Sequence, residues 1–338
     1  MSSELPRVTV FSLGGTIAST SAGDEALGVV PQLDARDLVS AVPKLRDIAT
    51  FETVGFRQTS SGDLTLIDLA ELAREIDRRF DDGVVGVIVT QGTDTIEEVS
   101  FALELLVAGS QPVVVTGAMR DATKPGGDGP ANLVAAACVA VSPQSSGLGT
   151  VVVLNDQIHA ARFVRKTNTS SPSTFESPTA GPIGWIVENR VRIALRTSSL
   201  KGLLEPSLDF VPDVALFEFA LGDDARLLRY VDTAQYAGIV IEGLGGGHVP
   251  SRAVPELTRL ASMMPVVLAS RTGSGDVLAS TYGFEGSEID LLSRGLISAG
   301  FLDGRKARIF LSYLLASGND VDAVRTAFAD INDALTGA

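Results

Sequence analysis

The feature that most constrains the fold of this chain is the alternation of short runs of valine, isoleucine and leucine with segments of helical pattern. Nearly continuous apolar runs of this length are typical of parallel strands that are buried on both faces. The sequence predicts such strands at Arg7–Leu13, Val84–Thr90, Pro112–Thr116 and Thr150–Leu154. Strands that alternate with helices predict an α/β fold built on a parallel sheet.

Helical patterns fill the intervals between these strands. The segment "TLIDLAELAREIDRRF" begins with Thr65 and Asp68 at the spacing of a capping box,. The segments "DTIEEVSFALELLVAG" and "GPANLVAAACVAV" follow the second and third predicted strands. The only cysteine, Cys138, lies in the last of these segments, and its alanine-rich surroundings predict a place in a helix core,.

The chain is long enough for more than one hydrophobic core, and its pattern predicts two domains,. We expect a larger N-terminal α/β domain at 1–196, a linker at 197–213 and a smaller C-terminal α/β domain at 214–338, both with parallel sheets. In "GWIVENRVRIAL" the pattern predicts a hairpin with its bend at Glu188–Arg190. In the second domain it predicts helices near 223–235 and 250–262, and two more from about 304.

Charge and composition restrict the partners. The chain has 41 acidic and 27 basic residues, a formal net charge of -14. Such a surface repels nucleic acid and anionic lipid, so we expect neither as a partner. No apolar run approaches the ~18 residues that span a bilayer. The first residues enter a strand without the pattern of a signal peptide, which predicts a cytoplasmic protein.

The sequence has few histidine and cysteine residues that could serve in catalysis. Only two histidines, His159 and His248, accompany the single cysteine, and neither histidine is near a strand–glycine turn of the first domain. Sites of the Ser-His-Asp or Cys-His type, and metal sites built from clustered ligands, are therefore disfavoured. We expect no metal and no cofactor. Nucleophilic chemistry would fall to threonine or serine, with lysine and aspartate for proton transfer.

Two glycine–threonine turns stand at the ends of predicted strands. Gly15 precedes Thr16 in "LGGT", and Gly92 precedes Thr93 and Asp94 in "QGTDT". In open α/β sheets ligands bind beyond the carboxyl ends of the strands, so both hydroxyls are candidates for one site. The spacing does not match a dinucleotide fingerprint. An ordinary turn, or a helix N-cap at Asp94 or Thr93, is the structural alternative.

Two further segments add candidates. "TGAMR" ends the third predicted strand with glycine, and "GGDGP" after it is interpreted as a helix start,. Lys166 lies in the polar stretch "RKTNTS". A lone lysine is usually a solvated surface charge, and it becomes a catalytic candidate if its loop folds back over the strand ends.

Taken together, these motifs resemble the bacterial-type L-asparaginase family. The segments "LGGTIA", "QGTDTIEE", "TGAMR…GDGPANL", "KTNTS" and "YGFEGSEIDLL…GRKARI" occur in the family's order over nearly the whole chain. The resemblance implies two α/β domains, a homotetramer built from intimate dimers, and hydrolysis of the side-chain amide of asparagine, with glutamine as a slower substrate. It also implies that no cofactor is required.

The resemblance also implies roles for individual residues. Thr16 stands where the family has its nucleophile, and Thr93, Asp94 and Lys166 stand where it has a second hydroxyl, an acid and a base. Ser61 matches a contact to the substrate carboxylate, and Ala118 matches a backbone contact to the amide. Glu288 matches an acid that a neighbouring subunit lends to the substrate ammonium.

Amide hydrolysis through a covalent acyl intermediate fits these residue types independently of the resemblance. A threonine hydroxyl needs a base, and the ordinary lysine pKa of about 10.4 falls with desolvation and rises beside a carboxylate. Backbone N–H groups of the glycine turns are candidates for holding the oxyanion.

The chain departs from the family pattern in the segment after Thr16. Residues 17–45 contain no tyrosine, although the family has one there, and His248 stands where an asparagine is common. The segment Ser19–Val30 is rich in glycine, serine and alanine, and we predict that it acts as a lid. The missing tyrosine keeps one alternative open, a weakly catalytic or non-catalytic amino-acid-binding protein on the same fold.

Overall fold

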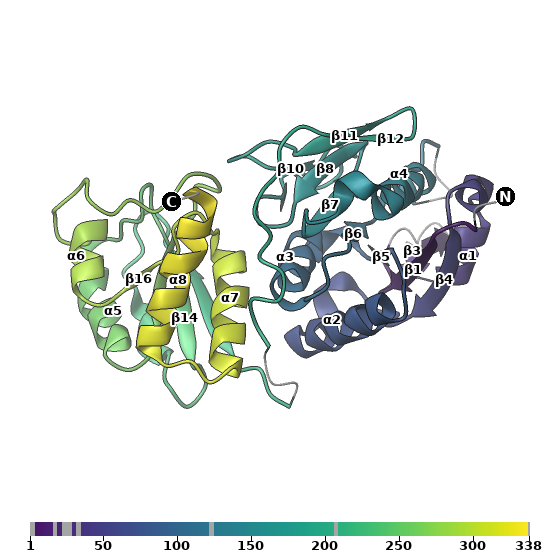
Figure 1. The fold of residues 1–338 in the computed structure, drawn as a ribbon. Helices are drawn as coiled ribbons and strands as arrows, with labels where there is room; N and C mark the ends of the chain where they lie inside the picture. The colour runs from purple at the N-terminus through teal and green to yellow at the C-terminus, as the bar shows by residue number, and fades with distance from the viewer. Residues whose placement is uncertain are drawn as a thin grey trace. The chain divides into compact units, whose positions relative to one another are not determined.

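The computed structural model describes residues 4–15, 19–21, 29–31, 35–121, 125–205 and 209–336. The chain divides into two compact units, Met1–Leu203 and Leu204–Ala338 (Figure 1). Each unit has a sheet covered by helices, and the larger unit is N-terminal. The predicted fold class, two α/β domains of unequal size with parallel sheets, is confirmed.

The first unit is built on an eight-stranded sheet with the order β12-β11-β8-β7-β6-β5-β1-β4. Five of these strands are parallel, β1 (Arg7–Ser12), β4 (Thr50–Gly55), β5 (Gly86–Thr90), β6 (Val113–Thr116) and β7 (Thr150–Leu154). The remaining three are antiparallel, β8 (Gln157–Ala160), β11 (Gly184–Val187) and β12 (Arg190–Ile193). The four strands predicted for this unit correspond to β1, β5, β6 and β7, whereas β4 and β8 were not predicted.

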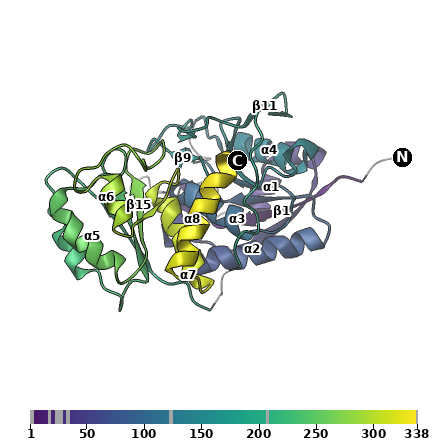
Figure 2. The same cartoon turned by 60° about the vertical axis from the view of Figure 1, so that its left-hand side comes forward.

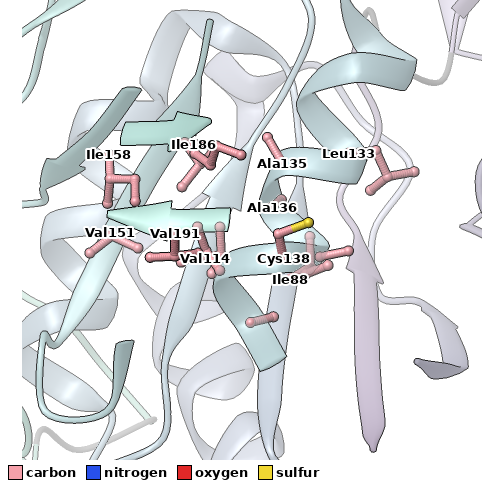
Figure 3. Close-up of a cluster of buried hydrophobic side chains, with 14 of the residues drawn as sticks. Ile88, Val114, Leu133, Ala135, Ala136, Cys138, Val151, Ile158, Ile186 and Val191 are labelled. Atoms are coloured by element: carbon pink, nitrogen blue, oxygen red, sulfur yellow. The ribbon is translucent and has the colours of Figure 1, made fainter. Parts of the chain in front are cut away.

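Helices cover both faces of this sheet. On one face, α1 (Ala35–Ser40) and α4 (Gly129–Val141) pack on a core that includes alternate residues of the strands (Figure 3). On the other face, α2 (Leu66–Asp81) packs against α3 (Ile96–Leu106). The predicted capping box starts α2, because Thr65 Oγ1 accepts from the Asp68 N–H and Asp68 Oδ2 accepts from the Thr65 N–H. Cys138 is buried in α4 as expected, and burial raises the pKa of its thiol.

One crossover in this sheet has an unusual hand. The connections β5–α3–β6 and β6–α4–β7 move in the same direction across the sheet, but α3 and α4 lie on opposite faces. The two crossovers therefore have opposite handedness. The handedness of β6–α4–β7 also differs from that of the connections β1–α1–β4 and β4–α2–β5. Right-handed crossovers are the strong rule for parallel strands, so this exception is not predictable from the sequence pattern.

The polar segment after β8 contains short strands that the sequence pattern does not predict. The strands β9 (Arg165–Lys166) and β10 (Phe175–Glu176) form a separate two-stranded ribbon. The predicted hairpin is confirmed, since β11 pairs antiparallel with β12 across Glu188 and Asn189, which both adopt positive φ,. Its bend is shorter than predicted, because Arg190 already belongs to β12 and pairs with Val187. The strands β2 (Ser19–Ser21) and β3 (Val29–Pro31) form a second small antiparallel pair.

A buried ion pair holds the end of the first unit against α3. Glu104 of α3 accepts from Arg162 Nη2 at 3.0 Å and from the Leu200 N–H at 2.9 Å. Both charged side chains are almost fully buried. A buried charge is tolerated when it is paired and hydrogen-bonded, so this contact holds residues near 200 against α3.

The second unit has a four-stranded parallel sheet with the order β13-β14-β15-β16. Its strands are β13 (Val214–Glu218), β14 (Gly238–Gly243), β15 (Val266–Ser270) and β16 (Ile297–Ser298), and its helices are α5 (Val254–Ala261), α6 (Glu288–Ser293), α7 (Gly304–Ala316) and α8 (Val321–Thr336). Helices α7 and α8 lie side by side (Figures 1 and 2).

One helix prediction in this unit is wrong. The segment near 223–235 contains only a short 3-10 helix at Arg226–Tyr230. Ala225 takes φ 59, and the side chains of Asp223 and Asp232 accept from backbone N–H groups two residues ahead. Aspartate side chains that hydrogen-bond locally stabilise turns at the expense of helix.

We predict that His159 makes the fold sensitive to acid. Its ring is buried in β8 beside Ser177 Oγ and Gln157 Oε1, and burial lowers the pKa from 6.5 to about 4. Between these values the unfolded chain binds a proton that the folded chain does not, so stability falls as pH decreases from about 6.5 towards 4,. The full loss is about 3 kcal/mol.

Thermal unfolding of the wild type and His159→Gln at pH 7.5 and pH 4.5 would measure this effect. We expect the fall in Tm between the two pH values to be smaller in the variant. An equal fall in both proteins would assign the acid sensitivity to other groups.

Candidate active site

The sheet topology brings the predicted turns to one edge. Strands β5, β1 and β4 are parallel neighbours, and β6 is the next strand beyond β5. After β1 the chain crosses to β4 on one side and then to β5 on the other, so the direction of winding reverses between β1 and β5. Reversal points of this kind form the ligand crevice of open α/β sheets. The chain segments that follow β1 and β5 leave the sheet at this point.

The glycines of the first turn are required by backbone contacts. Gly14 and Gly15 have φ values of 101° and 88°. A Cβ atom on Gly15 would lie 2.0 Å from the Gly92 backbone nitrogen, and a Cβ on Gly14 would lie 2.5 Å from the Thr59 carbonyl oxygen. The turns after β1 and β5 therefore touch backbone to backbone, which only glycine allows.

Further candidates pack around the second turn. Ser61 is buried, and its Oγ is 2.9 Å from the position that a Cβ on Gly92 would take. Thr95 Oγ1 donates to the Ser61 carbonyl oxygen at 3.0 Å. On the other side, a Cβ on Gly117 would lie 3.2 Å from Thr93 Cγ2. The structure thus brings the segments of Ser61 and Ala118 against the turn that contains Thr93.

Lys166 reaches this cluster from β9. Its Nζ donates to Thr93 Oγ1 at 2.9 Å and to Asp94 Oδ1 at 2.6 Å. The Lys166 side chain is 15% exposed and that of Asp94 is 77% exposed. The condition set by the sequence, that the polar loop must fold back over the strand ends, is met. Thr93, Asp94 and Lys166 form one hydrogen-bonded group.

The loop that contains Ala118 is held by two residues that the sequence interpretation did not include. Asp128 accepts from the backbone N–H groups of Met119 and Arg120, at 3.0 and 2.8 Å. Asn132 Nδ2 donates to the Gly117 carbonyl oxygen at 3.0 Å. The motif "GDGPANL" therefore does more than start α4, because it also positions the backbone beside Thr93.

Two predictions fall outside the described residues. Thr16 follows Gly15 directly but lies in the undescribed segment 16–18. Most of the predicted lid, residues 22–28, is likewise outside the described residues, and the lid stays a prediction.

Glu288 belongs to the second unit and is described within it. Its carboxylate is buried, and Oε1 accepts from the N–H groups of Thr281 and Tyr282 at 2.8 and 2.7 Å. His248 Nε2 lies 3.1 Å from Oε2. Burial acts to raise the pKa of Glu288, but the hydrogen bonds from Tyr282 and Thr281 outweigh it, and the pKa lies below its ordinary value. This carboxyl group is therefore charged at neutral pH.

Tyr282 and Phe284 flank the His248 ring, both in edge-to-face contact with ring centroids 4.9 and 5.2 Å away. Among the residues that the structure describes, no group of three or more histidine, cysteine or acidic side chains is arranged to hold a metal ion. In the same part of the chain, no helix is long and apolar enough to cross a membrane.

Fold and site together define a class, the two-domain α/β proteins with a Thr–Asp–Lys group beyond the carboxyl ends of a parallel sheet. Residues 7–199 match the family model "Asparaginase, N-terminal", and residues 213–328 match "Glutaminase/Asparaginase C-terminal domain". The chain belongs to the asparaginase family.

Individual relatives are similar in sequence to this chain over almost its whole length. The chain is 32% identical to "Probable L-asparaginase periplasmic" of Haemophilus influenzae, over 97% of this chain and 93% of the relative. It is 33% identical to "L-asparaginase 2" of Escherichia coli, over 96% and 93%. The crystal structure of a "Probable Cytoplasmic L-asparaginase" from Campylobacter jejuni is similar with a TM-score of 0.85 and 29% identity, covering 96% of this chain and 99% of that one.

We predict that Gly15→Ala disables the site, whereas Gly83→Ala does not. Both glycines have similar positive φ, but a Cβ on Gly83 has no atom within 4 Å, whereas one on Gly15 collides with Gly92. Each variant carries the backbone strain of about 1 kcal/mol for a left-handed residue. Only Gly15→Ala also separates the two turns.

Turnover and Tm of the two variants would measure this difference. We expect Gly15→Ala to lose at least about 10-fold in kcat, because small misplacements in a catalytic site are costly. Gly83→Ala should keep wild-type kcat. Equal activity in both variants would mean that the close approach of the turns is not needed.

Proposed function

We propose that this protein hydrolyses the side-chain amide of L-asparagine to L-aspartate and ammonia, with minor activity on glutamine. The observation that carries the proposal is the contact of Lys166 Nζ with both Thr93 and Asp94, beside the glycine turn that leads to Thr16. Membership of the asparaginase family supports the same activity. The names of the relatives support asparagine as the substrate.

In the first step the Thr16 hydroxyl oxygen attacks the amide carbon. The tetrahedral intermediate collapses as the amide nitrogen takes up the proton that the Thr16 hydroxyl released, so that ammonia leaves and an acyl ester remains on Thr16. Peptide N–H groups of the glycine turns hold the developing oxyanion. The N–H groups of Met119 and Arg120 are already used by Asp128, so this part of the 117–120 loop serves to shape the site.

In the second step a water molecule attacks the ester and releases aspartate, which restores the Thr16 hydroxyl. Thr93, Lys166 and Asp94 act on this water or on the leaving group as a proton-transfer unit. The Lys166 amine exchanges a proton with the Thr93 hydroxyl, and the Asp94 carboxylate orients the amine,. Ser61 and Ala118 are proposed contacts to the substrate carboxylate and amide. The overall reaction consumes one water and needs no oxidant or reductant.

We predict that Thr16→Ala, Thr93→Ala and Lys166→Met each lower kcat by about 10²-fold or more, because residues that act as one unit fail together. Ammonia release from L-asparagine, L-glutamine and their D-isomers is the measurement. The exposed Glu188→Gln in the hairpin turn is a control that should keep wild-type activity.

A variant with near-native kcat would remove that residue from the mechanism. A wild-type protein that binds L-asparagine but releases no ammonia would instead support the amino-acid-binding alternative.

We also propose a homotetramer built from intimate dimers, in which Glu288 binds the substrate ammonium in a neighbouring subunit. The low pKa of this buried carboxylate suits it to hold a cation. We predict that light scattering finds a tetramer and that Glu288→Gln raises KM for asparagine more than it lowers kcat. A fully active monomer would contradict the proposal.

The cytoplasmic location stays a prediction. One relative has the word periplasmic in its name, and the similar crystal structure has the word cytoplasmic.

A further inference from the structure

Residues 93–97 contact Lys166 at two points, its side-chain amine and its backbone N–H. Its Nζ contacts Thr93 and Asp94 in the turn before α3. Its backbone N–H donates to Glu97 Oε2 at 2.6 Å, and Glu97 lies in the first turn of α3. The Thr93 hydroxyl and the Glu97 carboxylate therefore belong to one continuous segment, and both contact Lys166.

The strand that carries Lys166 supplies little support of its own. Strand β9 has two residues, and within the described part of the chain it pairs only with the equally short β10, outside the main sheet. Two-stranded ribbons are marginally stable in isolation. A fixed position for Lys166 Nζ relative to Thr93 thus requires a contact between β9 and the body of the unit.

Glu97 is unusual for a helix-start acid because it is buried. Its exposed fraction is 1%, whereas the neighbouring Glu98 is half-buried. An acid in the first turn favours the helix through the dipole, but that interaction needs no burial. A buried carboxylate is costly unless strong hydrogen bonds satisfy it, and a backbone N–H bonded to a carboxylate is of the strong kind.

We propose that Glu97 is a positioning residue, which sets the distance from Lys166 Nζ to Thr93 Oγ1 by holding the Lys166 backbone. This inference rests on the proposed function for its kinetic effect, but the coupling of Glu97 to Lys166 does not. In this role Glu97 acts through the lysine, by way of the hydrogen bond to its backbone N–H.

Two conservative variants separate positioning from the ordinary role of an acid at a helix start. Glu97→Gln keeps the length and an acceptor oxygen but removes the charge. Glu97→Asp keeps the charge but shortens the side chain by one methylene, so that its oxygen no longer reaches the Lys166 N–H. Positioning predicts that glutamine preserves function and aspartate does not, and a helix-dipole role predicts the reverse.

The first readout is turnover. We expect Glu97→Ala and Glu97→Asp to lower kcat by about 10-fold or more, with a smaller change in KM, because the substrate contacts are untouched. Glu97→Gln should recover most of this loss. Glu104→Gln, which disturbs another buried glutamate of α3, should lower Tm while kcat at a permissive temperature stays near the wild-type value.

The second readout does not depend on the activity. Acetylation of the folded protein with a lysine-directed reagent, followed by peptide mass spectrometry, measures the accessibility of the Lys166 amine. We expect several-fold faster labelling in Glu97→Asp and Glu97→Ala than in the wild type and Glu97→Gln. If the wild type releases no ammonia from any amide, the proposed function fails, and the labelling still tests the coupling.

Folded Glu97→Asp with wild-type kcat and wild-type Lys166 labelling would overturn the proposal. Loss of activity in Glu97→Gln with retention in Glu97→Asp would also overturn it, because charge at the helix start would then be the property that matters. Should Glu97→Ala fail to fold, the aspartate and glutamine variants carry the test.

Discussion

The close approach of Gly15 to Gly92 is the constraint on which the candidate site depends. Two peptide backbones meet where side chains would normally keep them apart. A Cβ atom on Gly15 would lie only 2.0 Å from the Gly92 nitrogen, which leaves no room for any residue but glycine. The contact closes the gap between the turns after β1 and β5 at the reversal point of the sheet. It therefore sets the distance between these two turns, and the rest of the candidate site is arranged around them.

The parts around this contact are held by hydrogen bonds from buried and half-buried polar groups. Asp128 and Asn132 hold the 117–120 backbone, Glu97 holds the Lys166 backbone, and Lys166 bonds to Thr93 and Asp94. These hydrogen bonds place the groups of the site before the substrate arrives. Groups that are preorganised in this way stabilise developing charge without reorganisation. The opposite hand of the β6–α4–β7 crossover places α4, with Asp128 at its start, on the face away from α3.

Much of this arrangement could be predicted from the sequence, for identifiable reasons. Strands β1, β5, β6 and β7 are continuous apolar runs, and α2 has a capping box, so local chemistry and tertiary structure agree. Thr93, Asp94 and Lys166 form one hydrogen-bonded group, and the segments that contain Ser61 and Ala118 pack against the same turn. Strand β4 is half-buried at the sheet edge, so its apolar pattern is weak. The helix near 223–235 failed because local aspartate turns outweighed its helical spacing. Glu97 and Asp128 look like helix-start acids in the sequence, and only the tertiary contacts show what they hold.

We propose that Thr16 carries the acyl group while Thr93 serves proton transfer. Trypsin separates the two, since Thr16 lies in the peptide 8–36 and Thr93 in the peptide 80–120. The direct measurement is rapid quenching of the enzyme during turnover of L-asparagine, followed by mass spectrometry of these peptides. We predict an acyl adduct on the peptide that contains Thr16. A reproducible adduct on the Thr93 peptide alone would contradict it.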